Sequence, residues 1–209
     1  MLKPWTRRAG GLLALLLAGL APLAQAEDLL SQISRKLAAN SVLHADFAQS
    51  RQMAALKKPL QLSGRMVLSR ENGVIWSIVK PYQLGYVMTP KGVSELLPDG
   101  SRRERASRDI PGIGSVEGLF RGLLAGDRNL LQQHFAVEAK GSPAAWTLLL
   151  KPKPGPLQKG LGAVELAGAA QLERVSLTEP GGDSTQIRFS RIDAQSPLSA
   201  EESRLLGGR

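Results

Sequence analysis

Turn signals divide most of this chain into short segments, and their spacing limits its fold more than any other feature. Asn72-Gly73, Pro98-Asp99-Gly100, Gly141-Ser142-Pro143 and Pro180-Gly181-Gly182-Asp183 separate runs in which apolar residues recur with a period of two. Short strands joined by such turns, without a helix after each one, predict an antiparallel sheet. The expected strands are 45–49, 60–68, 74–79, 84–89, 92–97, 101–107, 134–140, 145–151, 162–168, 171–178 and 184–192.

Two stretches have helical spacing instead. Leu29, Leu30, Ile33 and Leu37 form an apolar stripe before the first strand. A second stripe lies within 115–133, in the middle of the chain, and predicts one or two short helices. The order is therefore a helix, about six strands, one or two helices and about five strands. Because the apolar stripes must face something, we expect a mainly β fold of the α+β type that wraps around its helices.

The first 26 residues are typical of a secretory signal peptide. A basic start is followed by a short apolar run, and Ala24-Gln25-Ala26 supplies the small residues that a signal peptidase needs. Cleavage after Ala26 is therefore expected. Position 27 is Glu and the chain has no cysteine, so an N-terminal lipid anchor on a mature cysteine is excluded. We expect one domain over residues 27–193 and a polar, loosely ordered C-terminal tail over 194–209.

The charge of the chain is positive. Three of the 27 basic residues fall in the expected signal peptide, so the mature chain carries 24 of them against 18 acidic residues, a net charge of +6. This field favours an anionic membrane surface or an acidic partner. The densest basic cluster is Arg102, Arg103, Arg105 and Arg108. It has no aromatic residues between the arginines, so nucleic-acid binding is not expected. It is either a charged edge strand or a docking patch for anionic lipid head groups.

Sequence motifs give little support for catalysis. His44 and His134 are the only histidines and lack metal-site spacing, so neither a metal nor a cofactor is expected. Gly112-Ile113-Gly114 begins like a dinucleotide fingerprint, but the final glycine is missing and no strand directly precedes it. Serine-hydrolase and phosphate-loop motifs are also absent from the sequence. We therefore expect a protein that is not an enzyme.

Two strands are apolar on both faces. These are Val74 to Val79 and much of Trp146 to Leu150. A sheet of this kind must be covered on each side. Periodicity alone leaves open whether the inner side is solid core or keeps a cavity.

Several segments, taken in order, resemble the periplasmic outer-membrane lipoprotein carrier family of LolA type. Ala45-Asp46-Phe47-Ala48-Gln49 resembles the family's Ala-x-Phe-x-Gln strand, and Trp146 to Pro154 its Leu-x-Pro-Lys strand ending. Further segments of the resemblance lie between these two: Gly64 to Leu68, Arg70, Trp76 and Lys80-Pro81-Tyr82. The resemblance implies a half-open antiparallel β-barrel of about 11 strands, with an N-terminal helix and mid-chain helices as a lid or plug. It also implies an apolar cavity for acyl chains.

The resemblance further implies a set of site residues. Contributors to the cavity or its lid are expected at Phe47, Met66, Leu68, Trp76, Tyr86, Met88, Phe120, Leu124 and Trp146. Arg70 matches the basic residue that holds the empty family fold closed by bonding backbone in the lid. The family has Arg-Pro there, whereas this chain has Arg70-Glu71, so a plain strand-end arginine is the alternative.

The function that the resemblance implies is a periplasmic carrier. It would bind the acyl chains of a lipoprotein and carry it, as a monomer, from an inner-membrane exporter to an outer-membrane receptor. The nine aromatic residues are few for this family, which motivates an alternative cargo: a non-protein lipid such as a glycolipid or a polyketide-like pigment ester. A periplasmic sensor of misplaced lipoproteins is a further alternative.

Overall fold

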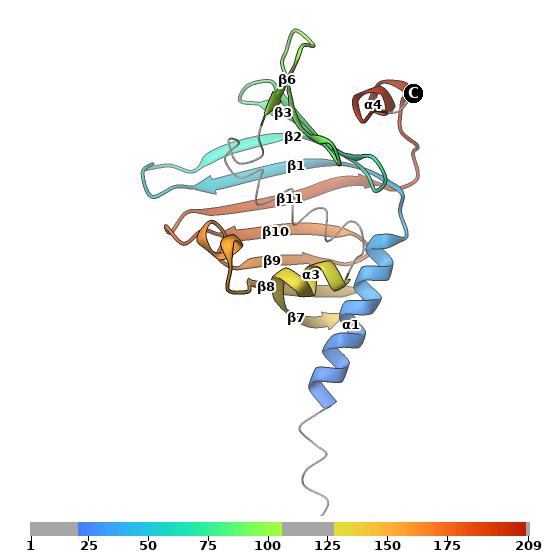
Figure 1. Cartoon of the computed structure of the whole chain (residues 1–209), viewed down its shortest axis with the longest axis vertical. Coiled ribbons are helices and arrows are strands. Elements are labelled where there is room, and N and C mark those ends of the chain that lie inside the picture. The colour runs from blue at the N-terminus through green and yellow to red at the C-terminus, as the bar shows by residue number, and fades with distance from the viewer. Residues whose placement is uncertain (1–20, 106–127, 208–209) are drawn as a thin grey trace, which may run out of the picture.

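The computed structural model describes residues 21–105 and 128–207. Its centre is an antiparallel sheet, which wraps strongly along its length (Figure 1). The eleven strands are β1 (Val42–Gln52), β2 (Leu60–Ser69), β3 (Gly73–Lys80), β4 (Leu84–Thr89), β5 (Gly92–Leu96), β6 (Arg102–Arg105), β7 (Phe135–Ser142), β8 (Ala145–Pro152), β9 (Val164–Gly168), β10 (Leu172–Thr178) and β11 (Ser184–Asp193).

The sheet consists of two meanders joined at its middle. Strand order is β6-β5-β4-β3-β2-β1-β11-β10-β9-β8-β7, so every neighbour is also a sequence neighbour except the pair β1 and β11. The edge strands β6 and β7 do not pair with each other, and the sheet stays open. The structure thus confirms the antiparallel, mainly β fold of eleven strands, wrapped but not closed.

Alternation along the strands gives the sheet an inner and an outer face. On β1, Ala45 and Phe47 are buried on the inner face, and Gln49 and Arg51 follow with the same parity. Gly64 lies opposite Phe47 on β2. A Cβ atom at Gly64 would lie 1.8 Å from the Ser77 carbonyl oxygen and 2.9 Å from the Phe47 ring. The glycine therefore permits the close approach of β2 to its neighbours at this point.

Two helices cover the inner face near β7. Helix α1 (Ala21–Ala38) contacts both β7 and α3 (Arg128–His134), and α3 also contacts β7. Both lie at the β7 end of the sheet (Figure 1). The stripe predicted for the first helix is buried, with Ile33 at 0% and Leu30 at 3% exposure. A short 3-10 helix, η2 (Pro156–Lys159), connects β8 to β9.

The C-terminal segment differs from the loosely ordered tail that its polarity predicted. It forms helix α4 (Ala200–Leu205), which begins with a capping box between Ser199 and Glu202. Its apolar residues pack on the outer face of the sheet, where Leu206 joins buried Val67, Ile75 and Val87. The few apolar side chains of the segment, rather than its average polarity, decide its structure. This contact also supplies the outer cover that the doubly apolar strand β3 requires.

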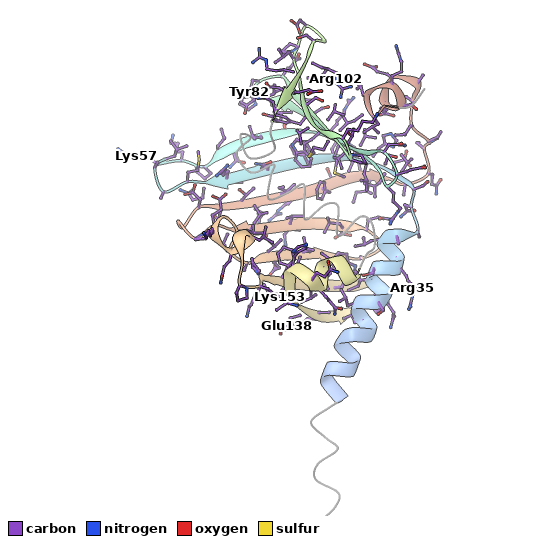
Figure 2. All side chains as sticks on the ribbon, viewed as in Figure 1. Arg35, Lys57, Tyr82, Arg102, Glu138 and Lys153 are labelled. Carbon is purple, nitrogen blue, oxygen red and sulfur yellow. The ribbon has the colours of Figure 1, made fainter. Side chains whose placement is uncertain are left out.

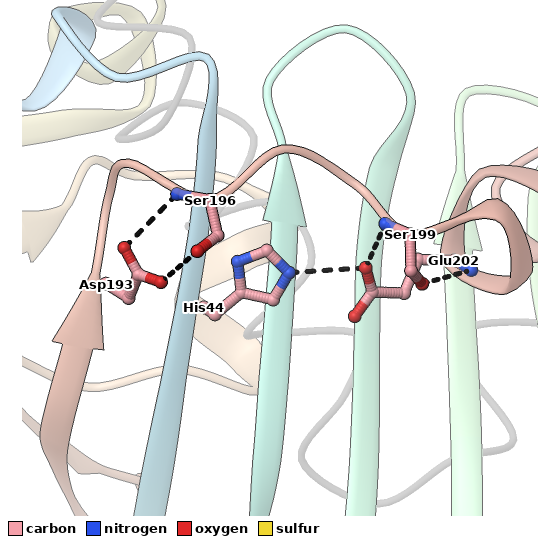
Figure 3. Close-up of polar contacts among 5 residues, drawn as sticks. All are labelled: His44, Asp193, Ser196, Ser199 and Glu202. Carbon is pink, nitrogen blue, oxygen red and sulfur yellow. Dashed lines mark hydrogen bonds and ion pairs between the residues drawn. The ribbon is translucent and has the colours of Figure 1, made fainter.

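Polar contacts reinforce this packing of α4. His44 Nε2 on β1 lies 3.2 Å from Glu202 Oε2, and Ser199 N donates to the same carboxylate at 2.7 Å (Figure 3). Asp193, at the end of β11, accepts hydrogen bonds from Ser196 (Figure 3). Within the described residues, none of the helices combines the length and apolar character that crossing a membrane requires.

Candidate functional site

The inner face holds a hollow of about 330 Å³. It lies toward the end of the sheet formed by the β1–β2, β3–β4 and β10–β11 connections. Most of its lining is apolar, and the lining residues are Gln49, Arg51, Met53, Leu60, Leu62, Trp76, Ile78, Tyr82, Tyr86, Met88, Leu177, Thr185 and Ile187. The volume is at the lower end of the range of about 300–1,000 Å³ for small-molecule sites. Among the described residues, the inner face is therefore not packed solid at this end of the sheet.

Trp76, which lines the hollow, packs against two further aromatic rings behind it. The Trp76 ring stacks on Phe47 with centroids 3.9 Å apart and an interplanar angle of 22°. Phe189 meets Trp76 edge-on at 6.3 Å and 89°. All three are at most 8% exposed. Such aromatic pairs contribute about 0.5–1.5 kcal/mol beyond the area they bury, so this wall is held in place by its own packing.

Arg51 places a cation at the largely apolar hollow. Its side chain is 15% exposed, and its Nη2 lies 3.2 Å from Glu179 Oε1 and 3.7 Å from Asp183 Oδ2. Arg51 Nε is buried without a hydrogen-bond partner among the described residues. Leaving a buried donor unpaired costs about 1–3 kcal/mol. A structural role alone would favour full pairing, so this arginine is a candidate for contact with a ligand.

The turns around Arg51 are tied to each other. Asp183, in the β10–β11 turn, also accepts a hydrogen bond at 2.9 Å from the backbone N of Ala54, which follows β1. Tyr82, in the β3–β4 connection, lines the same end of the hollow and is 48% exposed. Lys57 lies farther out, at the tip of the β1–β2 hairpin (Figure 2). The hollow therefore reaches solvent at an end that is braced by ion pairs.

Arg70 lies at the opposite end of β2 from the hollow. Its Nη2 donates to the Leu37 carbonyl at 2.7 Å and its Nε to the Asn40 carbonyl at 3.4 Å. Leu37 belongs to the last turn of α1, where a cation is favoured by the helix dipole, and Asn40 follows just after the helix. Burial lowers the pKa of Arg70 below its ordinary value. The resemblance implied a bond from Arg70 to backbone in the lid, whereas the bonds that the described residues contain join it to the end of α1 and to Asn40.

The arginine cluster of β6 is divided by the alternation of the strand. Arg102 donates to the Leu205 carbonyl at 3.0 Å and to Ser94 Oγ at 3.1 Å, on the side of α4. Arg105 has the other parity, and its Nε lies 3.4 Å from Glu95 Oε2. Burial, followed by the charge of Glu95, raises the pKa of Tyr86 above its ordinary value of 10.0. Arg103 is exposed on this edge strand.

The remaining sequence-predicted residues fall into three groups. Trp76, Tyr86 and Met88 line the hollow. Phe47, Met66, Leu68 and Trp146 are buried in the same core cluster as Trp76 and Met88 but are not part of the lining. Phe120, Leu124 and Arg108 lie outside the described residues.

Sequence reasoning missed the polar part of the lining. Gln49 and Arg51 share the parity of Ala45 and Phe47, so their place on the inner face could have been inferred from the period of two. The ion pairs of Arg51 could not, because Glu179 and Asp183 are distant in sequence. Among the described residues, no group of three or more His, Cys, Asp or Glu side chains is arranged to hold a metal ion.

An open antiparallel sheet with a largely apolar hollow on its inner face is the architecture of a protein that shelters a hydrophobic ligand. Residues 21–194 match the family model described as outer membrane lipoprotein carrier protein LolA-like, and the chain belongs to this family. The resemblance seen in the sequence is thereby confirmed.

Individual proteins of known sequence or structure are similar to this chain. An outer-membrane lipoprotein carrier protein of Dechloromonas aromatica (strain RCB) is 28% identical over 184 residues, covering 87% of this chain and 85% of the relative. Among solved structures, MucB is similar in fold with a TM-score of 0.52 and 13% identity, over 85% of this chain and 62% of MucB. A LolA superfamily protein from Nitrosomonas europaea has a TM-score of 0.49 and 10% identity, over 83% and 94%.

Proposed function

We propose that this protein is a periplasmic carrier that binds the acyl chains of a lipidated cargo in the hollow and moves it between membranes. The observation that carries the proposal is the hollow itself, whose wall is mostly Leu, Ile, Met and aromatic side chains. Water finds few hydrogen-bond partners on such a surface. An acyl chain that moves from water into the hollow is stabilised by about 0.8 kcal/mol per methylene. Membership of the lipoprotein carrier family makes acylated protein the favoured cargo.

The size of the hollow suits a carrier that must also release its cargo. Burying about ten methylenes would contribute about 8 kcal/mol, which corresponds to a Kd on the order of micromolar before any costs. Complete burial of two or three acyl chains would exceed the practical limit of non-covalent affinity, near −20 kcal/mol. A hollow of about 330 Å³ buries only part of such a cargo, so the affinity stays low enough for the cargo to be released.

Arg70 is proposed as a latch that acts through α1. The supporting contacts are its two hydrogen bonds to the carbonyls of Leu37 and Asn40. Among the described residues, α1 is the longest helix on the inner face. In this proposal, loosening the end of α1 lets the helix shift on the inner face when cargo loads.

The route that we propose runs from an inner-membrane exporter to an outer-membrane receptor, with the signal peptide removed after Ala26. The net charge of +6 expected for the mature chain would favour approach to anionic head groups, where each nearby basic residue contributes about 1 kcal/mol. Arg103 is the residue of the β6 cluster that we propose for such docking, because it is exposed and Arg102 and Arg105 bond within the protein.

Two neighbouring residues of β3 offer a matched test of the hollow. Ile78 lines it and is 7% exposed, whereas Val79, at a bulge in the pairing with β2, is not part of the lining and is 47% exposed. Protein purified from its own periplasm should carry acylated peptide in native mass spectrometry. Ile78→Asp should lose it, because a carboxylate in the apolar wall opposes a buried chain. Val79→Asp should retain it. Equal cargo on both variants, with circular dichroism showing both folded, would contradict the proposed site.

A non-protein lipid is the second candidate cargo. The observation that favours it is the lining, in which Trp76, Tyr82 and Tyr86 are the aromatic members of a mostly aliphatic wall. The same mass measurement separates the two candidates. Acylated peptide supports the lipoprotein carrier, whereas a small lipid alone on the native protein would replace it with this alternative.

A further inference from the structure

Three polar side chains form a strip on the wall of the hollow. Gln49 and Arg51 point inward from β1, and Thr185 lies directly opposite Arg51 on β11. All three line the hollow, next to Leu60 and Leu62 of β2. We call Gln49, Arg51 and Thr185 the polar strip. It stands at the solvent end of the hollow, while Trp76 and Met88 line it farther along the sheet.

The polar strip has hydrogen-bonding capacity that the protein does not use. Both acidic contacts of Arg51 are made through Nη2, and its Nε has no partner among the described residues. Gln49 and Thr185 make no side-chain hydrogen bond within the described part of the chain. An arginine has five N–H donors and no acceptor. The strip therefore offers mainly donors, and it suits a ligand group that is an acceptor.

The charges around Arg51 indicate which kind of acceptor group fits the polar strip. Arg51 faces two carboxylates, those of Glu179 and Asp183, so the immediate cluster carries a net charge of −1 when all three groups are ionised. A ligand carboxylate entering here would meet two like charges, and like charges at short range disfavour the ionised form. A neutral carbonyl accepts a hydrogen bond from Arg51 without this repulsion. An ester or amide oxygen fits the strip better than a free acid.

We propose that the polar strip binds the ester or amide carbonyl that links an acyl chain to the rest of the cargo. The chain then extends from the strip along Leu62, Ile78 and Met88, and the remainder of the cargo leaves past Tyr82 into solvent. This inference rests on the proposed function, because it assigns the part of an acylated cargo that the strip contacts. It gives the carrier a preference for acyl esters and amides over ethers and free fatty acids.

Three probes with the same sixteen-carbon chain isolate the carbonyl. Monopalmitoyl glycerol has the ester, hexadecyl glycerol ether has the same head without the carbonyl, and palmitate has a charged head. Binding to the native protein is measured by titration calorimetry below the aggregation concentration of each probe. We expect the ester to bind about tenfold more tightly than the ether, as one hydrogen bond to a charged donor implies. Palmitate should bind more weakly than the ester. Equal affinity for ester and ether would overturn the inference.

Arg51→Met tests the donor with little change of side-chain length. The variant should bind ester and ether equally, with ether affinity close to that of the unmodified protein. Arg188→Met is the matched control, since Arg188 is exposed on the outer face of β11 and should keep the tenfold preference. Gln49→Leu and Thr185→Val should each reduce the preference by less.

The outcomes separate this inference from the proposed function. If no probe binds the native protein, the acyl carrier itself is wrong and the strip has no such role. If ester and ether bind equally well to the native protein, the hollow is an acyl site and only the strip assignment fails. The comparison of the two probes on native protein holds even if Arg51→Met does not fold. Loss of both probes in a folded Arg51→Met would also overturn the inference, because it would mean a general effect on the hollow.

Discussion

The region around β8 and β9 and the region around the hollow belong to the same sheet but are packed very differently. Leu148, Leu150, Val164 and Leu166 are at most 1% exposed, on strands that follow the β7 edge covered by α1 and α3. Around the hollow, Tyr82 is 48% exposed and Arg51 leaves a donor unpaired. The same alternation of apolar residues along a strand therefore produces solid core in one region and a cavity in the other, depending on what packs against the strand. We call the region around β8 and β9 the packed region.

Truncating one leucine in each region should show the largest difference. Leu166→Ala, in the packed region, should lower the free energy of unfolding by about 3–4 kcal/mol, whereas Leu62→Ala at the hollow should cost about 2 kcal/mol or less. The reason is that a wall already beside an empty space loses fewer contacts. Urea unfolding measures both values. Equal costs would mean that the hollow is as tightly packed as the rest.

Enlarging a side chain should also destabilise the packed region more than the wall of the hollow. Val164→Phe should destabilise the protein by about 1–3 kcal/mol, because a solid core must shift to admit a ring. Leu62→Phe should leave the midpoint of thermal unfolding nearly unchanged and reduce acyl binding, since the ring can occupy the hollow. If Leu62→Phe instead destabilised as much as Val164→Phe, the distinction between the two regions would fail.

Removing the Arg70 contacts should have a smaller effect, of about 1 kcal/mol on stability, as for a cation at a helix C-terminus. Arg70→Leu should increase amide hydrogen exchange at the end of α1 and should alter the rate of loading or release of cargo. Arg65→Leu, exposed on the outer face of the same strand, serves as the control. Unchanged transfer kinetics in Arg70→Leu would remove this residue from the mechanism.

Acid should weaken the contact of α4, which is the smallest expected effect. Although burial opposes it, hydrogen bonds from Ser199 and His44 lower the pKa of Glu202 below its ordinary value of 4.5. The stabilisation by this carboxylate is therefore complete above pH 4.5 and is lost as the pH falls through the lowered pKa. Limited proteolysis near residue 200 should speed up over that range. Glu202→Gln should show a cleavage rate that no longer changes with pH over that range, and an unchanged profile would argue against this role.

The sequence predicted the sheet well because its signals are local. Turn clusters and a period of two located all eleven strands to within a few residues, and the stripe of Leu30 and Ile33 located the buried face of α1. The site was predicted less well. Periodicity indicates that Phe47 and Met88 face inward, but whether a residue lines the hollow or the core depends on partners distant in sequence. The place of α4 depends on a few apolar residues, among them Leu206, within a polar segment.

The pairing of β1 with β11 has a consequence for how the chain acquires its fold. All other strand pairs are adjacent in sequence, so each meander can form by the successive pairing of neighbouring strands in local hairpins. The seam instead unites residues such as Phe47 and Phe189. Closing so long a stretch of chain carries an entropic penalty that local hairpins avoid, and distant contacts slow folding. We expect closure of the seam to set the folding rate, so changes at Phe189 should mainly slow folding, while changes at positions that pack only after the seam has closed should mainly speed unfolding.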